Sequence, residues 1–109
     1  MGRLQERMKA DLTAALRDRD RPAVTALRTA LAAIANAEAV PSDNRYQHPV
    51  VGQLNEVPRR ELAEEQVEAV LRAEAAERQQ AIEEYESLGL ADAAARLRAE
   101  QAALTRYLG

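Results

Sequence analysis

Residues 82–97 read IEEYESLGLADAAARL, and this stretch predicts a turn between two helices. Gly89 is of the residue type that most often adopts the left-handed backbone conformation ending a helix, and Leu90 is placed to fold back onto the last turn. Asp92 falls in the first turn of the helix that follows, where the helix dipole favours a negative charge. The short connection over 87–91 therefore predicts an antiparallel hairpin of two helices.

Four helices are predicted in all. Apolar residues recur every three or four positions over the ranges 2–18, 22–39, 61–87 and 91–108. Asp20 is placed to cap the second of these helices. Residues 41–60 hold three of the four prolines and form a long connection between the second and third helices. We therefore expect an all-α fold, an antiparallel four-helix bundle that forms a single domain over residues 1–109.

Two apolar stripes carry further expectations. The second helix has a narrow seam with spacings of 3, 4 and 3 that is typical of coiled coils, formed by Val24, Leu27, Leu31 and Ile34. This seam favours self-association as one hypothesis. Leu104, Tyr107 and Leu108 continue a stripe almost to the last residue, although chain ends are usually polar. We expect them to close the bundle against the first two helices.

Composition supports a helical protein whose helices approach closely. Alanine supplies 24 of the 51 hydrophobic residues, and Phe and Trp are absent. Alanine is the best helix former and a poor strand residue. The absence of cysteine excludes disulfides and thiol chemistry.

Charge is unevenly distributed along the chain. The net charge is −3, but residues 1–38 carry +2 and residues 61–109 carry −6. No polybasic patch is present, so indiscriminate nucleic-acid binding is not expected. The charged N-terminus does not resemble a signal peptide, and no uncharged run is long enough to span a bilayer. A cytoplasmic protein without a membrane partner is the expectation.

Side chains that carry catalysis or bind metals are scarce. Ser42 and His48 share the long connection but have no acidic partner at a recognisable spacing, so no catalytic residue is assigned. Glu64 and Glu68 are one turn apart, but helical bundles that bind metals usually add histidines to such glutamates. A solvated acidic face is therefore expected, with no metal and no cofactor.

Charges that interrupt the apolar stripes are better candidates for a site. Glu74 and Arg78 are spaced i, i+4 on the third helix, and Arg28 and Glu38 fall along the track of the second. A buried charge needs an opposite charge or a hydrogen-bonding partner. The favoured interpretation is an interhelical network, Arg28 or Arg78 against Glu74 or Glu38, which fixes helix register. The alternative is a recognition groove in which the same groups face a partner.

Three arginines cluster at the turn after the first helix. Arg17, Arg19 and Arg21 could contact phosphate. Asp18 and Asp20 alternate with them and cancel most of their field. A solvated turn is therefore the favoured interpretation.

The pattern resembles the YqeY-like proteins. Residues 9–39, KADLTAALRDRDRPAVTALRTALAAIANAEA, look like the opening of that family, with matches at Asp11, Ala15, Asp20, Leu27, Arg28, Ala33, Asn36 and Glu38. The back half matches at Glu74, Arg78, Tyr85, Gly89, Asp92, Leu97, Glu100, Leu104, Tyr107 and Leu108. The resemblance covers most of the chain except residues 41–60, and it concerns the N-terminal helical domain of the family. Ala63 departs from the pattern because it stands where a Ser or Thr cap usually opens the third helix.

The resemblance implies a function. The family is similar to the tail region of GatB, a subunit of the aspartyl/glutamyl-tRNA amidotransferase. It therefore implies a non-catalytic helical interaction module that binds tRNA or an amidotransferase-related partner. The candidate contact residues are Arg28, Asn36, Glu38, Glu74 and Arg78. Carbon–nitrogen ligase activity with glutamine as amide donor, as an accessory part, is one alternative, and a self-associating structural bundle is another.

Overall fold

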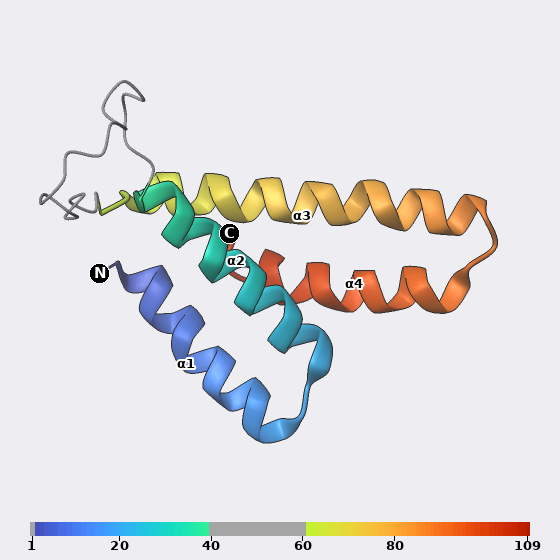
Figure 1. The fold of residues 1–109 in the computed structure, drawn as a ribbon, viewed down its shortest axis with the longest axis horizontal. Helices are drawn as coiled ribbons and strands as arrows, with labels where there is room; N and C mark the ends of the chain where they lie inside the picture. Colours follow the sequence, from blue (N-terminus) through green and yellow to red (C-terminus); the bar gives the residue numbers. More distant parts are fainter. Residues whose placement is uncertain (1, 40–60) are drawn as a thin grey trace, which may run out of the picture.

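The computed structural model describes residues 2–39 and 61–109, and this part of the chain contains four α-helices and no strand. The helices are α1 Arg3–Asp18, α2 Arg21–Ala39, α3 Glu64–Ser87 and α4 Ala91–Thr105 (Figure 1). The all-α prediction is confirmed. The connection 41–60, with Ser42 and His48, lies outside the described residues.

The α3–α4 hairpin turns at Gly89, as the sequence predicts. Gly89 has a φ of 77°, its N–H donates to the carbonyl of Glu86 at 3.0 Å, and the Leu90 N–H donates to the carbonyl of Tyr85 at 2.9 Å. These two bonds define the Schellman motif, which satisfies carbonyls at the end of α3. A Cβ added at Gly89 would meet nothing within 4 Å, so the backbone conformation alone requires glycine here.

The α1–α2 turn uses the same arrangement without a glycine. Arg19 has a φ of 58°, and the Asp20 N–H donates to the carbonyl of Ala15 at 2.9 Å. The side chain of Asp20 then accepts a bond from the Ala23 N–H at 3.3 Å, which confirms Asp20 as the cap of α2. A non-glycine residue in the left-handed region costs about 1 kcal/mol, so this turn holds some strain.

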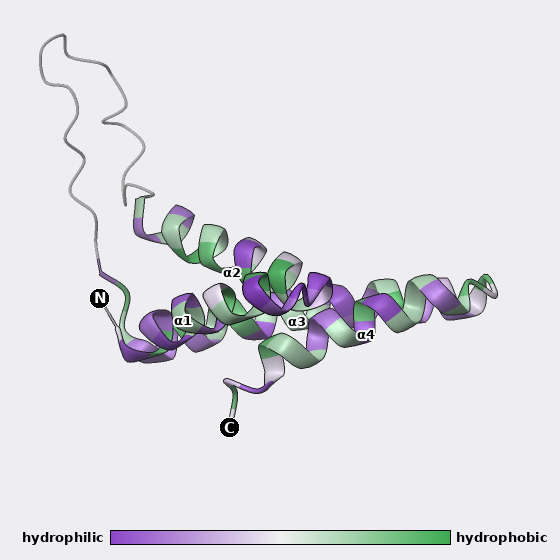
Figure 2. Ribbon diagram, turned by 90° about the horizontal axis from the view of Figure 1, so that it is seen from below, coloured by the Kyte–Doolittle hydropathy of each residue, from purple (hydrophilic) through white to green (hydrophobic). Residues whose placement is uncertain are grey.

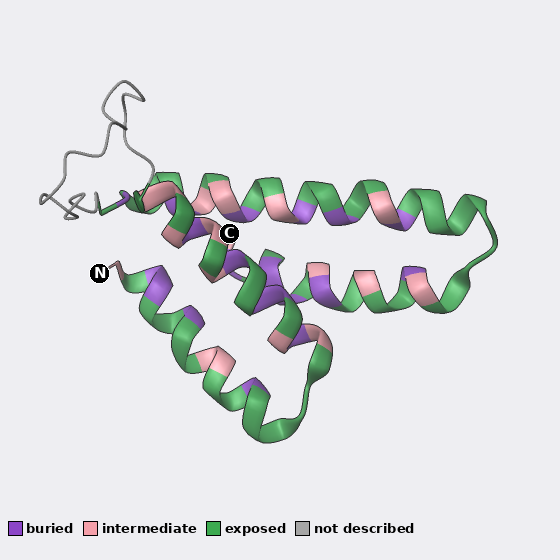
Figure 3. Cartoon of the chain, in the orientation of Figure 1, coloured by how far each residue is buried: buried purple, intermediate pink, exposed green. Residues whose placement is uncertain are grey.

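The two hairpins pack with α2 crossing obliquely over α3 and α4, and α2 contacts each of the other three helices (Figure 1). Hydrophobic and hydrophilic residues alternate along the helices (Figure 2), and the buried residues face inward between them (Figure 3). The largest fully buried side chains belong to one hydrophobic core cluster: Met8, Leu27, Ile34, Val67, Leu71 and Leu104. The predicted seam of α2 belongs to this core or packs against it. The seam therefore packs against other helices of the same chain.

The C-terminal stripe closes the fold. Leu104 is fully buried, Tyr107 is 5% exposed, and Leu108 packs against the core. The Tyr107 hydroxyl donates to the Asp11 carboxylate of α1 at 2.5 Å, and α4 packs against α2. The expectation that these residues close the bundle against the first two helices is confirmed.

Candidate functional site

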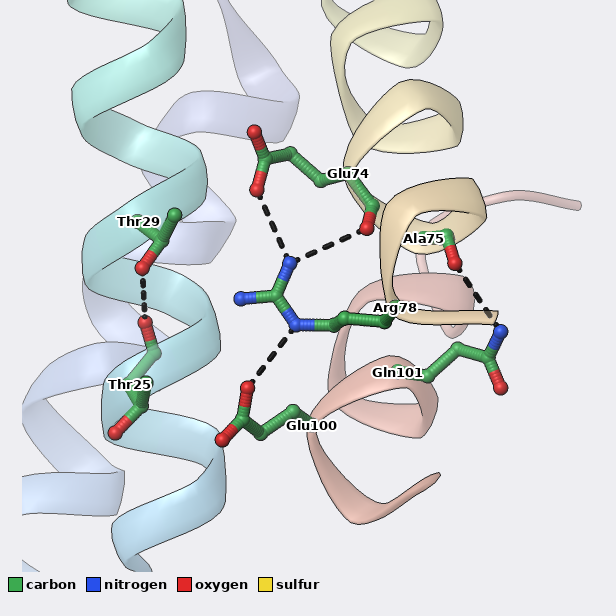
Figure 4. Close-up of polar contacts among 7 residues, drawn as sticks. All are labelled: Thr25, Thr29, Glu74, Ala75, Arg78, Glu100 and Gln101. Atoms are coloured by element: carbon green, nitrogen blue, oxygen red, sulfur yellow. Dashed lines mark hydrogen bonds and ion pairs between the residues drawn. The ribbon is translucent and has the colours of Figure 1, made fainter. Parts of the chain in front are cut away.

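A cluster of three charged side chains lies between α3 and α4. The Nε of Arg78 donates to Glu100 Oε1 at 3.1 Å, and its Nη1 donates to Glu74 Oε1 at 3.0 Å and to the Glu74 carbonyl at 3.2 Å. Figure 4 shows the guanidinium between the two carboxylates. The three side chains are only 10–14% exposed. Nε and Nη1 both donate to carboxylates, and two negative charges surround the one guanidinium. This arginine therefore holds α3 and α4 in register and does not offer a site for an anion.

The hairpin explains how the sequence assembles this cluster. Glu74 and Arg78 are one turn apart on α3, which puts them on the same face. Arg78 and Glu100 lie at equal distances in sequence from Gly89, so the antiparallel hairpin places them opposite one another. Gln101 adds a second cross-link, because its Nε2 donates to the Ala75 carbonyl at 3.2 Å. No buried side-chain polar atom in the described residues lacks a hydrogen-bond partner.

The sequence-based network is right in one part and wrong in another. The pair Arg78–Glu74 forms as expected. Arg28, however, is exposed and makes no ion pair with any described residue, so it does not belong to the network. Glu38 is half-buried and accepts a bond from Gln5 Nε2 at 3.2 Å. Glu100, which closes the network, was absent from the predicted site.

Alanines explain why Arg28 turns outward. The buried positions of α2 are Ala23, Ala26, Leu27, Ala30 and Ile34. The three alanines move the centre of the buried face away from Arg28, because small side chains let α2 pack closely on that side. Asn36 is exposed as well. The larger apolar residues alone suggested a different centre.

The outer face of α2 carries no carboxylate. Its exposed residues are Arg21, Thr25, Arg28, Thr29, Ala32, Asn36 and Ala39. Glu38 is the single acidic residue of α2, and it is half-buried against Gln5. In a chain of net charge −3, this is a distinct face of arginine, hydroxyl and amide groups. These are side chains that hydrogen-bond to phosphate and sugar oxygens.

A hollow lies beside the α1–α2 turn. Its volume is about 410 Å³, and it is lined by Leu16, Arg19, Arg21, Val24 and Thr25. The structure thus brings two of the three predicted phosphate-contact arginines to one hollow, and the third, Arg17, is exposed outside its lining.

A second polar cluster surrounds Tyr107. The guanidinium of Arg7 lies 5.0 Å from the ring centroid and that of Arg106 lies 5.8 Å from it. Burial raises the pKa of the Tyr107 phenol above its usual value, and the hydrogen bond to Asp11 raises it further. The hydrogen bond and the contact of Arg7 with the ring tie the C-terminal end to α1.

Metal-ion clusters and membrane-spanning helices are two further features that depend on the chemistry of the side chains in the described ranges 2–39 and 61–109. No group of His, Cys, Asp and Glu side chains there is arranged to hold a metal ion. None of the helices in those ranges combines the length and the apolar character needed to cross a membrane.

The fold and the site define a small helical protein with a charge cluster whose members bond one another and with a carboxylate-free outer face on α2. The chain belongs to the YqeY-like family. The model of that family, described as Yqey-like protein, matches residues 5–109. No curated protein and no solved structure matches the chain.

Proposed function

We propose that the chain is a non-catalytic helical module that binds tRNA through the outer face of α2. The observation that carries this proposal is the absence of carboxylates among the exposed residues of that face, which holds Arg21 and Arg28 together with Thr25, Thr29 and Asn36. The resemblance of the YqeY-like family to the tail of a tRNA-dependent amidotransferase supports the choice of RNA. Such a role would be carried out in the cytoplasm.

The geometry favours backbone contacts over base recognition. Two arginines on a helix face provide point contacts to phosphates, and Asn36 and the threonines add hydrogen bonds to sugars and phosphates. The acidic surface of α3 and α4 repels RNA, so it restricts binding to the side of α2. With so few cations, we expect binding that is weak and strongly dependent on salt.

The test is a fluorescence anisotropy titration with bulk tRNA over a salt series. We compare the wild type with Arg21→Ala/Arg28→Ala and with a control, Arg72→Ala/Arg96→Ala, which removes two exposed arginines from α3 and α4. Both variants change the net charge equally. Removing two phosphate contacts should reduce the slope of log affinity against log salt by about 2, and the control should leave it unchanged.

Two results would overturn the proposal. Absence of binding by the wild type at low salt would eliminate RNA as the partner. Equal losses in the two variants would show that binding follows net charge and not the face of α2. In the first case, an amidotransferase-related protein partner would be sought by pull-down with the wild type and Arg28→Ala.

A further inference from the structure

Large exposed hydrophobic side chains occur at two places in the described part of the chain. Leu88 is 69% exposed, Leu90 is 48% exposed and Tyr85 is 36% exposed, and all three lie at the tip of the α3–α4 hairpin. Leu16, 47% exposed, lines the hollow beside the α1–α2 turn. Figure 2 shows hydrophobic residues at the tip, and Figure 3 shows that the tip is exposed throughout.

The tip is acidic as well as apolar. Residues 83–92, EEYESLGLAD, hold four carboxylates and no basic residue. Glu86 pairs with Arg98 of α4, and Glu83 accepts a bond from Gln79. The side chains of Glu84 and Asp92 form no ion pair with any residue in the described ranges.

The lining of the hollow has the opposite character, because it holds two arginines and no carboxylate, and Asp18 and Asp20 of the same turn lie outside it. Leu16 and Val24 provide apolar surface, and Arg19 and Arg21 are exposed cations that form no ion pair within the described residues. A tip of apolar and acidic groups and a hollow of apolar and basic groups are complementary in both respects.

We infer that the α3–α4 tip of one copy docks in the α1–α2 hollow of a second copy. Within one chain the tip lies at the far end of the hairpin from α1 and α2, so the contact must join two copies (Figure 1). The second copy is the occupant that the observations favour, because the chain itself supplies the matching surface. Reciprocal docking closes a dimer, and one-sided docking builds an open chain of copies. The contact is small, so the association is weak and falls with added salt.

The experiment is complementary charge reversal followed by sedimentation equilibrium. One variant reverses the tip, Glu83→Lys/Glu84→Lys, and the other reverses the hollow, Arg19→Glu/Arg21→Glu. The helix dipole favours lysine near the C-terminal turn of α3 and Arg21→Glu in the first turn of α2, whereas Arg19→Glu places a negative charge at the C-terminal end of α1. Far-UV circular dichroism therefore checks that both variants are folded before sedimentation. The apparent mass of the wild type should rise above the monomer mass of 12.0 kDa as the concentration increases. The apparent mass of each variant alone should stay at the monomer value, and that of an equimolar mixture of the two variants should rise again.

Controls separate docking from general attraction. Leu88→Ser/Leu90→Ser keeps the net charge and should weaken the wild-type self-association at least about tenfold, because leucine burial is lost. Adding Leu88→Ser to the tip-reversed variant should weaken the association recovered in the mixture. Arg72→Glu, distant from both surfaces in sequence, should associate as the wild type does.

The inference is overturned if the wild type stays at 12.0 kDa at the highest concentration reached. It is also overturned if either reversed variant associates like the wild type, or if the mixture stays monomeric. The leucine variants leave the outer face of α2 intact, so the failure of this inference is distinguishable from failure of the proposed tRNA binding.

Discussion

Replacing Arg78 by methionine removes the cation at the centre of the buried cluster. Methionine keeps an unbranched stem but leaves Glu74 and Glu100 without their partner, at side-chain exposures of 14% and 11%. Breaking a buried ion pair by removing one member typically costs 3–5 kcal/mol. Because the carboxylates retain some contact with water, we expect the lower end, about 3 kcal/mol.

That loss is a large part of the total. A domain of this length has a free energy of unfolding of roughly 5–15 kcal/mol. The variant should therefore still fold at 25 °C, with a Tm lower by roughly 12 to 24 °C. Urea denaturation followed by far-UV circular dichroism measures the free energy of unfolding, and a thermal scan measures Tm.

Arg98 provides a matched control. It pairs with Glu86 between the same two helices, but the two side chains are about half exposed. Exposed pairs contribute about 0.2–1 kcal/mol, so Arg98→Met should cost less than about 1 kcal/mol. If Arg78→Met costs no more than Arg98→Met, burial does not determine the strength of the cluster and the reasoning fails.

A triple variant tests the cause of the loss. Replacing Arg78, Glu74 and Glu100 together by methionine leaves no unpaired charge between the helices. Such apolar replacements are often neutral or stabilising, so the triple variant should recover to within about 1 kcal/mol of the wild type or exceed it. A triple variant as unstable as Arg78→Met would show instead that the loss comes from the packing of the arginine stem.

The remaining predictions concern helix ends and the C-terminal anchor. Ala63 begins α3 without a side-chain cap, so Ala63→Ser should raise the free energy of unfolding in urea by about 1 kcal/mol. Gly89→Ala should lower it by about 1 kcal/mol, and Arg19→Gly should raise it by about 0.5–1 kcal/mol, because both residues have positive φ; changes of the opposite sign would contradict the assigned backbone conformations. Tyr107→Phe loses the bond to the Asp11 carboxylate and should cost about 1.5–3 kcal/mol at neutral pH. The raised pKa of Tyr107 means that the phenol stays protonated in the folded state when the unfolded chain ionises, so its stabilisation is complete below about pH 10 and declines above it. The difference in free energy of unfolding between the wild type and Tyr107→Phe, measured by urea denaturation, should therefore narrow above about pH 10. A difference that stays constant with pH would contradict this account of the Tyr107 phenol.

The fold could be predicted because its signals are local. The left-handed position of Gly89 and the cap at Asp20 each follow from a few neighbouring residues. The end of the chain could also be predicted, because Leu104 and Tyr107 continue a helical period that only burial explains. The oblique crossing of α2 depends on how whole helix surfaces match, which no local signal contains.

The site was harder to predict because alanine is ambiguous. Alanine fits a buried or an exposed position, so only the larger residues of α2 indicate its inner face, and their pattern predicts that Arg28 is buried. The same ambiguity concealed Glu100. Ala103, one turn further along α4, is buried on the same face as Glu100, but an alanine does not mark that face as buried in the sequence. The sequence distance of each residue from Gly89 was the signal that pairs Arg78 with Glu100, and it becomes usable once the hairpin is assumed.

The charge cluster lies along the hairpin between the hydrophobic core and the tip. Leu71 and Leu104 are fully buried in the core, whereas beyond Arg78 the hairpin buries only Ile82 and Ala94 among its hydrophobic residues. Little apolar surface therefore holds the outer part of the hairpin together, so the bonds of Arg78 contribute a larger share of its stability. A purely apolar contact at this point would allow α3 and α4 to slide, because hydrophobic attraction has no preferred register. The directed bonds of the guanidinium to a carboxylate on each helix fix one register, which keeps the tip in a single shape that a second copy can recognise.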